Sequence, residues 1–392
     1  MVSLALPLAA VTGCRNQKPG ASDRSVAPEI ALAAGPVYQF EPGTQSAPRY
    51  WSAAAGDLNG DGNMDIVVCN LRENVYALLG RGDGTFASPI QINGGAQVET
   101  CRLADLDGDG WLDLVTSAFF EKCIFVCRGR GDGTFDEPVR ISLKTQPYDV
   151  IPVDLNGDGR VDLAANCFAK GETMGSVLIL INLLDGRFGE PTGFTVGGYP
   201  IQMAAGDFTG DGRPDLAVSC QESASPEPTG RPDSVWLLVN IGQGDFNIGT
   251  KLECADPSSL VAADLNRDGF LDLLVDSAAV MLFMGNATGT FQEAVPIETT
   301  MRGLAVADLN GDGWPDVVVG NVCFRNCGDS PGAIGGDSLL MPGPELAMDP
   351  RCGEYPVGLV LENLNGDGRI DIVMVGTTGM QVFCNESQFD PH

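Results

Sequence analysis

Short apolar runs recur along the chain, and loops rich in Asp and Gly separate them. Residues 66–68, 273–275 and 317–319 consist of Ile, Leu and Val alone, which is typical of buried strands. In most units a second apolar run follows the first, as at residues 177–181, and a later run such as 90–92 mixes polar with apolar residues. The pattern predicts repeated groups of strands, each ending in a more exposed outer strand.

A nine-residue motif organises these groups of strands. It begins at Asp57 as Asp-Leu-Asn-Gly-Asp-Gly-Asn-Met-Asp and occurs seven times, at intervals of 44 to 57 residues. This period suits one four-stranded blade of a β-propeller. We therefore predict an all-β fold, a seven-bladed β-propeller with calcium-binding loops, in which an N-terminal strand at residues 37–42 closes the ring.

At these motifs the chain resembles the FG-GAP and VCBS repeat families and, more distantly, the propeller head of integrin alpha subunits. The resemblance rests on the seven motif copies and on the turn Gly-Asp-Gly-Thr-Phe, which is complete at residues 82–86 and 131–135. It covers residues 37–392. The resemblance implies a seven-bladed propeller built from these repeats.

The motif has the chemistry of a calcium-binding loop. Side chains at positions 1, 3, 5 and 9 offer oxygen, position 7 offers its carbonyl, and the glycine at position 6 permits a left-handed turn. We expect up to seven structural calcium ions, held by Asp57, Asn59, Asp61, Asn63, Asp65, Asp105, Asp107, Asp109, Trp111, Asp113, Asp154, Asn156, Asp158, Arg160, Asp162, Asp207, Thr209, Asp211, Arg213, Asp215, Asp264, Asn266, Asp268, Phe270, Asp272, Asp308, Asn310, Asp312, Trp314, Asp316, Asn363, Asn365, Asp367, Arg369 and Asp371. Thr209 and Asn363 replace stronger ligands, so their loops are expected to bind most weakly.

Two alternatives to this interpretation are an EF-hand and a turn without metal. An EF-hand carries a bidentate Glu at position 12, where this chain has Val68, Thr116 and other residues without a carboxylate. A turn without metal explains one copy of the motif, but it leaves aligned carboxylates in every blade to repel one another. The formal net charge of −29 favours bound cations and argues against nucleic acid as a partner.

The N-terminal residues resemble a bacterial lipoprotein signal. Residues 1–13 form a short apolar segment, and the sequence from Val11 to Cys14 resembles a lipobox, in which the Cys becomes the lipidated N-terminus. We expect residues 1–13 to be a signal peptide, residues 14–35 to hold the lipidated Cys14 and a flexible tether, and residues 36–392 to be the propeller. An ordinary secretion signal or a buried strand is the alternative. The protein is expected to be exported and anchored by lipid to the outer membrane, at the cell surface or in the periplasm.

The cysteines predict disulfide bonds, because the exported chain contains twelve of them. The expected bridges join neighbouring blades and are Cys69 with Cys101, Cys220 with Cys254, and Cys327 or Cys323 with Cys352. Zinc bound by Cys323 and Cys327 is the alternative. The single histidine is His392, so Ser-His and Cys-His catalysis and His-ligated zinc are not expected.

The function expected from these features is non-catalytic recognition or scaffolding. Six residues before each motif the chain reaches the mouth of the central channel, where the candidate ligand-binding residues are Trp51, Glu99, Tyr148 and Arg302. Their mixture of aromatic and charged side chains suits a glycan or a protein as the surface ligand. A polysaccharide lyase or hydrolase on the same architecture is the alternative, because fold alone does not decide between binding and catalysis.

Overall fold

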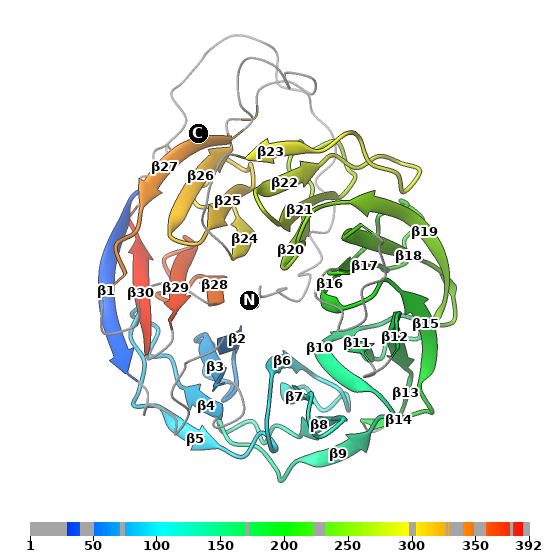
Figure 1. Cartoon of the computed structure of the whole chain (residues 1–392). Coiled ribbons are helices and arrows are strands. Elements are labelled where there is room, and N and C mark those ends of the chain that lie inside the picture. Colours follow the sequence, from blue (N-terminus) through cyan, green and yellow to red (C-terminus); the bar gives the residue numbers. More distant parts are fainter. Residues whose placement is uncertain are drawn as a thin grey trace.

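The computed structural model describes residues 30–39, 51–70, 75–168, 172–184, 186–222, 232–297, 303–326, 328, 340–348, 358–376 and 379–386. Seven four-stranded antiparallel sheets stand like blades around a central channel (Figure 1). The predicted all-β fold and its seven-bladed propeller arrangement are confirmed. Within the described ranges the chain forms strands and turns, and no helix there is long and apolar enough to cross a membrane.

Each blade repeats one order of strands from the channel to the rim, and the blades are numbered 1 to 7 by their innermost strands. The innermost strands are β2 (Trp51–Gly56), β6 (Thr100–Ala104), β10 (Gln146–Val153), β16 (Pro200–Gly206), β20 (Leu260–Ala263), β24 (Leu304–Ala307) and β28 (Gly358–Glu362). The second strands are β3 (Asp65–Asn70), β7 (Asp113–Ala118), β11 (Asp162–Phe168), β17 (Asp215–Cys220), β21 (Asp272–Asp276), β25 (Asp316–Val319) and β29 (Asp371–Val375).

The two outer positions of each blade follow the same rule. The third strands are β4 (Val75–Leu78), β8 (Cys123–Cys127), β12 (Gly175–Leu180), β18 (Ser234–Gly242), β22 (Val280–Phe283), β26 (Val322–Asn326) and β30 (Gly379–Asn385). The outermost strands are β5 (Ile90–Ile92), β9 (Val139–Ser142), β15 (Thr192–Val196), β19 (Asp245–Glu253), β23 (Val295–Ile297), β27 (Leu340–Glu345) and β1 (Leu32–Gln39). A small hairpin of β13 (Asn182–Leu184) and β14 (Arg187–Phe188) accompanies blade 3.

Hydrophobic packing between neighbouring blades holds the ring together. Every residue of β7 and β17 is buried, whereas β9 is largely exposed, as the sequence pattern predicts for middle and outer strands. The seven larger clusters of buried side chains each lie between two adjacent blades. Burying one aliphatic side chain contributes about 1.5–3 kcal/mol, so these clusters are a main source of stability.

The N-terminal strand β1 completes the seventh blade. It pairs antiparallel with β30, so that Leu32 lies opposite Asn385. The Tyr38 hydroxyl accepts a hydrogen bond of 2.6 Å from the N–H of Phe86 in blade 1, and the two rings pack edge to face at 5.7 Å. Strand β1 therefore contacts both the last and the first blade. It begins at Leu32, inside the range 14–35 that the sequence analysis assigns to the tether.

Two of the expected disulfide bonds, Cys69 with Cys101 and Cys220 with Cys254, are not formed, and these predictions are wrong. All nine described cysteines are free. Cys69 and Cys101 lie within hydrogen-bonding reach of each other, but the Cys101 thiol contacts the carbonyl oxygen of Ser52 at 3.4 Å. Cys220 and Cys254 belong to clusters on opposite sides of blade 4, so the sheet separates them. The third expected bridge involves Cys352, which, like Cys327, lies outside the described residues.

Candidate functional site

The nine-residue motifs form seven loops on one face of the ring, called loops 1 to 7 after their blades. Each loop follows an innermost strand and ends at the first residue of the second strand, as Asp57 follows β2 and Asp65 begins β3. The loops comprise residues 57–65, 105–113, 154–162, 207–215, 264–272, 308–316 and 363–371. Because all seven occupy the same place in their blades, the structure arranges their carboxylates in a circle on this face.

Backbone N–H groups bind the carboxylate at position 1. In loop 1, Asp57 accepts hydrogen bonds of 2.8 and 2.9 Å from the N–H groups of Gly60 and Gly62. The same carboxylate is held in a similar way in five further loops, at Asp105, Asp154, Asp207, Asp264 and Asp308. Gly60 and Gly62 have φ values of 71° and 82°, a conformation that glycine adopts without strain. The loop therefore curls around its first carboxylate.

The side chains at positions 3 and 5 also point into the loop. In loop 1, Asn59 accepts a hydrogen bond from the N–H of Asp61 and donates one to its carboxylate, both at 3.0 Å. The same pair recurs as Asn156 with Asp158, Asn266 with Asp268, Asn310 with Asp312, and Asn365 with Asp367. In loop 2 the ligand oxygens of Asp105, Asp107 and Asp109 all lie within 4.8 Å of one another. This spacing fits one hard cation bound at about 2.3–2.6 Å from each oxygen.

The aspartate at position 9 fastens the loop to the third strand. In loop 6, Asp316 accepts hydrogen bonds from the N–H groups of Leu309 at 3.0 Å and Asn326 at 2.8 Å. The corresponding residues, which make the same two bonds, are Asp65, Asp113, Asp162, Asp215, Asp272 and Asp371. Burial raises the pKa of Asp316 to about 7 although both N–H donors lower it. The fold therefore buries these carboxylates at a cost that a nearby cation would offset.

Position 7 differs most between the loops. Its N–H donates to the aspartate at position 5 in all seven loops, which leaves its carbonyl available to a cation. The side chains there are Asn63, Trp111, Arg160, Arg213, Phe270, Trp314 and Arg369. The Trp111 ring packs against Gly60 of the neighbouring blade. The contact is so close that a Cβ on Gly60 would lie only 2.8 Å from the ring. Trp314 stacks with the guanidinium of Arg267 in loop 5 at 5.3 Å.

Two buried oxygens at atypical positions have no hydrogen-bond partner among the described residues. They are Oγ1 of Thr209 at position 3 of loop 4 and Oδ1 of Asn363 at position 1 of loop 7. An unsatisfied buried oxygen costs about 1–3 kcal/mol, and a cation in the loop would satisfy each of them. Together with the close oxygens of loop 2, they form a donor set of the kind that a hard cation such as calcium takes.

Aromatic side chains gather on the face opposite the loops and form what we call the aromatic cluster. Tyr148 in β10 packs edge to face on Phe119, which follows β7, and Phe119 packs on Phe120. Tyr148 also packs on Tyr199, which precedes β16, at 6.1 Å, and Tyr199 lies 4.9 Å from Phe168. The cluster joins blades 2, 3 and 4, and Phe120 is 51% exposed. These residues stand at the strand ends remote from the loops.

The four predicted ligand-binding residues differ in their surroundings. Tyr148 belongs to the aromatic cluster. Glu99 is buried. The burial of Tyr199 and the nearby charge of Glu99 both raise the pKa of Tyr199. Trp51 begins β2, but its side chain, like all of Arg302, lies outside the described residues. The structure thus brings Glu99 and Tyr148 into one region and leaves the other two undescribed.

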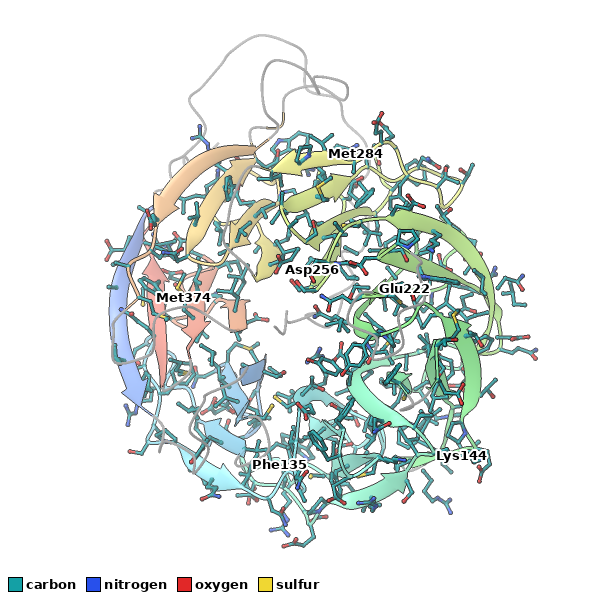
Figure 2. The ribbon with its side chains drawn as sticks, viewed as in Figure 1. Phe135, Lys144, Glu222, Asp256, Met284 and Met374 are labelled. Atoms are coloured by element: carbon teal, nitrogen blue, oxygen red, sulfur yellow. The ribbon has the colours of Figure 1, made fainter. Side chains whose placement is uncertain are left out.

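Further carboxylates lie near the channel on the same face. Glu222 and Asp256 stand at the inner ends of their blades (Figure 2). Glu222 accepts a hydrogen bond of 2.7 Å from the N–H of Gly198, and Asp256 accepts one of 2.8 Å from the side-chain amide of Gln221. These bonds fix the orientation of both carboxylates. This face of the ring therefore combines aromatic rings with positioned hydrogen-bond acceptors.

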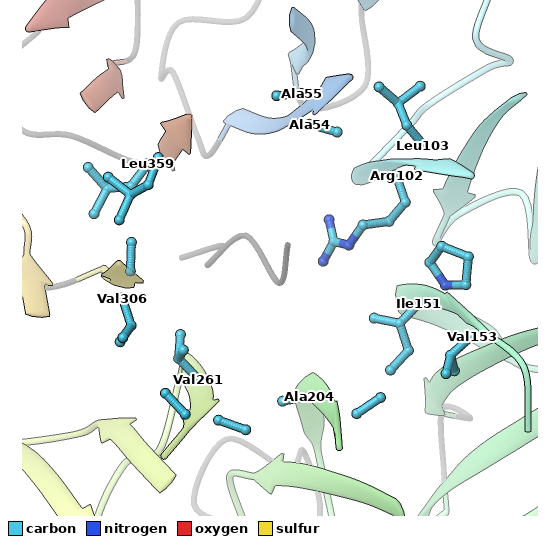
Figure 3. A pocket seen from close by; sticks show the side chains of 16 residues that line it. Ala54, Ala55, Arg102, Leu103, Ile151, Val153, Ala204, Val261, Val306 and Leu359 are labelled. Carbon is cyan, nitrogen blue, oxygen red and sulfur yellow. The ribbon is translucent and has the colours of Figure 1, made fainter. Parts of the chain in front are cut away.

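The channel wall itself is apolar except at one residue. A cavity of about 230 Å³ is lined by aliphatic side chains, by Pro152 and by Arg102 (Figure 3). Arg102 forms a buried ion pair of 2.7 Å with Asp149 and also donates to Ser52 Oγ at 3.2 Å. Burial raises the pKa of Asp149, while Arg102 acts to lower it. Because the ion pair joins blades 2 and 3 and is internally neutral, we assign Arg102 to the framework.

Most of the aromatic cluster could not be predicted from the sequence. Counting back six residues from the motif reaches Tyr148, whereas Phe119, Phe168 and Tyr199 stand at other distances from theirs. The sequence feature that could have pointed to these aromatic residues is their position at the ends of apolar runs. There the second strand of one blade approaches the first strand of the next blade. The pairing of the rings depends on packing between blades, which no local pattern encodes.

Two segments of the chain match a known repeat family. Residues 57–116 and 276–319 match the FG-GAP-like repeat. Over 200 residues the chain is 27% identical to integrin alpha-7 of Rattus norvegicus, a match that covers 45% of this chain and 16% of the integrin. Integrin alpha-7 of Homo sapiens is 28% identical over 146 residues, which is 32% of this chain and 12% of the integrin. The similarity therefore concerns a small part of each integrin.

Solved structures share the architecture. A lectin of Agrocybe aegerita that recognises non-reducing terminal N-acetylglucosamine superposes with a TM-score of 0.50 at 23% identity, over 75% of this chain and 79% of the lectin. Sqt1 of Saccharomyces cerevisiae superposes with a TM-score of 0.50 at 11% identity, over 89% of this chain and 97% of Sqt1. At these identities the likeness shows the fold alone.

Proposed function

We propose that this chain, an FG-GAP-repeat β-propeller similar to that of integrin alpha subunits, is a non-catalytic recognition module that binds a glycan. The aromatic cluster carries this proposal. The rings of Phe119, Tyr148 and Tyr199 pack together at the strand ends remote from the loops, and the charge of Glu99 lies near Tyr199. A sugar ring has an apolar face that stacks on aromatic side chains and hydroxyls that donate to carboxylates. A site of this kind suits a glycan better than an apolar or anionic ligand.

A glycan array on the wild type and on Tyr148→Ala and Tyr199→Ala tests the proposal. N-acetylglucosamine oligomers are the first probe, since the propeller lectin of Agrocybe aegerita recognises that sugar. We expect both substitutions to weaken binding at least about tenfold, because each removes a stacking surface. Val139→Ala, at a 60% exposed position on the rim, is the matched control and should bind as the wild type does. Binding that survives both Tyr substitutions rejects the site, and binding to no glycan favours a protein partner.

Calcium in the motif loops is the second part of the proposal. The close oxygens of Asp105, Asp107 and Asp109 and the unsatisfied oxygens of Thr209 and Asn363 support it. A tenfold excess of calcium over the dissociation constant would add about 1.4 kcal/mol per site, so the melting temperature should fall sharply in excess chelator. Equal midpoints with calcium and with chelator would reject a stabilising role.

The proposed location is the cell surface or the periplasm, with a lipid anchor at Cys14. Cys14 and the signal segment 1–13 lie outside the described residues, so support comes from their sequence and from the extracellular calcium concentrations that such loops need. Cys14→Ser should move the protein from the membrane fraction to the soluble fraction without changing its melting temperature. Unchanged membrane partitioning would reject the anchor.

A further inference from the structure

In loops 3, 4 and 7 the arginine at position 7 turns back onto a carboxylate of its own loop. The three ion pairs join Nη2 of the arginine to Oδ2 of the aspartate at position 5, and they are Arg160 with Asp158, Arg213 with Asp211, and Arg369 with Asp367. That aspartate is one of the residues expected to hold calcium. A positive charge of the protein therefore already contacts the expected ligand set.

Hydrogen bonds fix these guanidinium groups. The Nε of Arg160 donates to the carbonyl oxygen of Asn182, and the Nε of Arg213 donates to that of Asn240, both at 3.0 Å. Both acceptors belong to the same blade as their arginine. The Nε of Arg369 donates to its own partner Asp367 at 2.9 Å. The arginines are thus anchored beside the loop by more than one bond.

Counting charges separates the loops into two groups. Loops 1, 5 and 6 each hold three carboxylates at positions 1, 3, 5 and 9, with no guanidinium paired to them among the described residues. Loops 3 and 4 hold three carboxylates and one paired guanidinium, and loop 7 holds two carboxylates and one. The arginine therefore removes one negative charge from each of these three loops.

Two other arginines stand near loops without having this effect. Arg128 pairs with Asp107 at 3.0 Å, but loop 2 has four carboxylates, so it keeps as many uncompensated charges as loop 1. Arg267 in loop 5 stacks on Trp314 and forms no ion pair with Asp308 or Asp312 among the described contacts. Loops 1, 2, 5 and 6 therefore each keep three uncompensated carboxylates.

We propose that Arg160, Arg213 and Arg369 act as built-in counter-ions that divide the seven loops into two classes. Loops 1, 2, 5 and 6 need calcium to balance their carboxylates and bind it tightly. Loops 3, 4 and 7 keep their form without metal and bind calcium at least about tenfold more weakly, because the ion must approach a guanidinium. The inference rests on the proposed calcium binding. The identity of the ligands alone predicts weak binding only at loops 4 and 7, whereas the arginines place loop 3 in the weak class as well.

Native mass spectrometry over a range of free calcium, from about 1 µM to about 10 mM, tests this division because it covers the affinities of such loops. We expect a plateau at four bound ions, followed by up to three more only at concentrations at least about tenfold higher. Seven ions bound in one phase would overturn the division while leaving calcium binding itself intact. The binding of no calcium would instead refute the proposed metal, so the two failures are distinguishable.

Single substitutions test the arginines directly. Arg160→Gln and Arg213→Gln should each raise the plateau from four ions to five, because Gln keeps a polar side chain without the charge. Arg369→Gln should leave the plateau at four, because loop 7 then carries two uncompensated carboxylates, as many as loops 3 and 4 have in the wild type. Arg140→Gln is the matched control, since that exposed arginine pairs with Glu121 on the rim, and its plateau should stay at four. The reverse change Asn63→Arg in loop 1 should lower the plateau to three. A plateau of four in both Arg160→Gln and Arg213→Gln, with circular dichroism showing that they are folded, overturns the proposal.

Discussion

The Nδ2 atom of Asn240 in blade 4 lies 2.9 Å from the carbonyl oxygen of Leu155, at position 2 of loop 3. The same bond from one blade to the preceding loop recurs as Asn182 to Leu106, Asn326 to Leu265 and Asn385 to Leu309. In blades 1 and 2 the position of this asparagine is occupied by glycine, and backbone N–H groups of Gly84 and Gly133 donate to Leu364 and Leu58 instead. An asparagine side chain at four joints and a backbone N–H at two therefore make the same contact between neighbouring blades.

Replacing Asn240 should weaken the joint between blades 3 and 4. Its Nδ2 also donates to the carbonyl oxygen of Pro214 at 2.9 Å, so Asn240→Ala leaves two carbonyl groups without this donor. We expect a loss of about 2–4 kcal/mol in the free energy of unfolding, measured by urea denaturation at saturating calcium. Asn247→Ala, at an exposed position on β19, is the control and should cost little. Equal stability of the two variants would contradict the role of Asn240.

Removing one partner of the channel ion pair should be more costly. The side chains of Arg102 and Asp149 are only 4% and 2% exposed, so Asp149→Ala leaves a buried guanidinium unpaired. The expected loss is about 3–5 kcal/mol in the free energy of unfolding. Asp136→Ala breaks the pair with Arg130, whose side chains are more than half exposed, and should cost less than about 1 kcal/mol. A similar loss in the two variants would show that the channel pair is not effectively buried.

Stability of the metal-depleted protein should increase as the pH falls from about 8 to about 5.5. Burial raises the pKa of Asp113 and Asp272 to about 6 and that of Asp316 to about 7, from 3.8. At a pH between the unfolded pKa of 3.8 and the raised native pKa, the native state binds protons that the unfolded state does not. Lowering the pH through this range therefore stabilises the native state. Asp158 and Asp367, whose pKa values are lowered, titrate below this range.

Thermal melting of calcium-depleted protein at the two pH values measures this effect. The calcium-saturated protein is the control, and its melting temperature should depend less on pH, because bound cations favour the ionised carboxylates. A melting temperature of the depleted protein that is the same or higher at pH 8 would contradict the expectation.

The thiols should remain free in solution. All nine described cysteines are free, and burial raises the pKa of Cys167 and Cys323 to about 12, which keeps these thiols unreactive while the protein is folded. Thiol titration under denaturing conditions should find at least nine free groups, and a reducing agent should not change the melting temperature. A lower melting temperature after reduction would show that a disulfide contributes to stability.

Much of the fold could be predicted from the sequence because the repeat is local. The run from Asp65 to Val68 begins with an acid and continues with buried residues, and this arrangement recurs in every blade at a period that fits four strands. The oxygen-bearing residues of each loop are adjacent in sequence, so their convergence within one turn could also be foreseen.

The remaining features depend on contacts between blades. Cys220 and Cys254 are close in sequence, but the sheet of blade 4 separates them, and no spacing rule reports which side of a sheet a cysteine faces. From the sequence, the arginines at position 7 are expected only to offer their backbone carbonyl to the metal. The direction of their long side chains could not be predicted, because it is set by distant acceptors such as the carbonyl oxygen of Asn182. The aromatic cluster needs three blades to form.

The pairing of β1 with β30 has a consequence for the order in which the molecule folds. Residues 32–39 acquire their hydrogen-bonded neighbour only when residues 379–385, more than 300 positions later in the sequence, have been synthesised. A nascent chain therefore carries an incomplete seventh sheet until residues 379–385 have been synthesised, and contacts of such large sequence separation form slowly. Deleting residues 32–39 or residues 379–385 should leave the same sheet with an unpaired edge, although the two deletions remove opposite ends of the sequence.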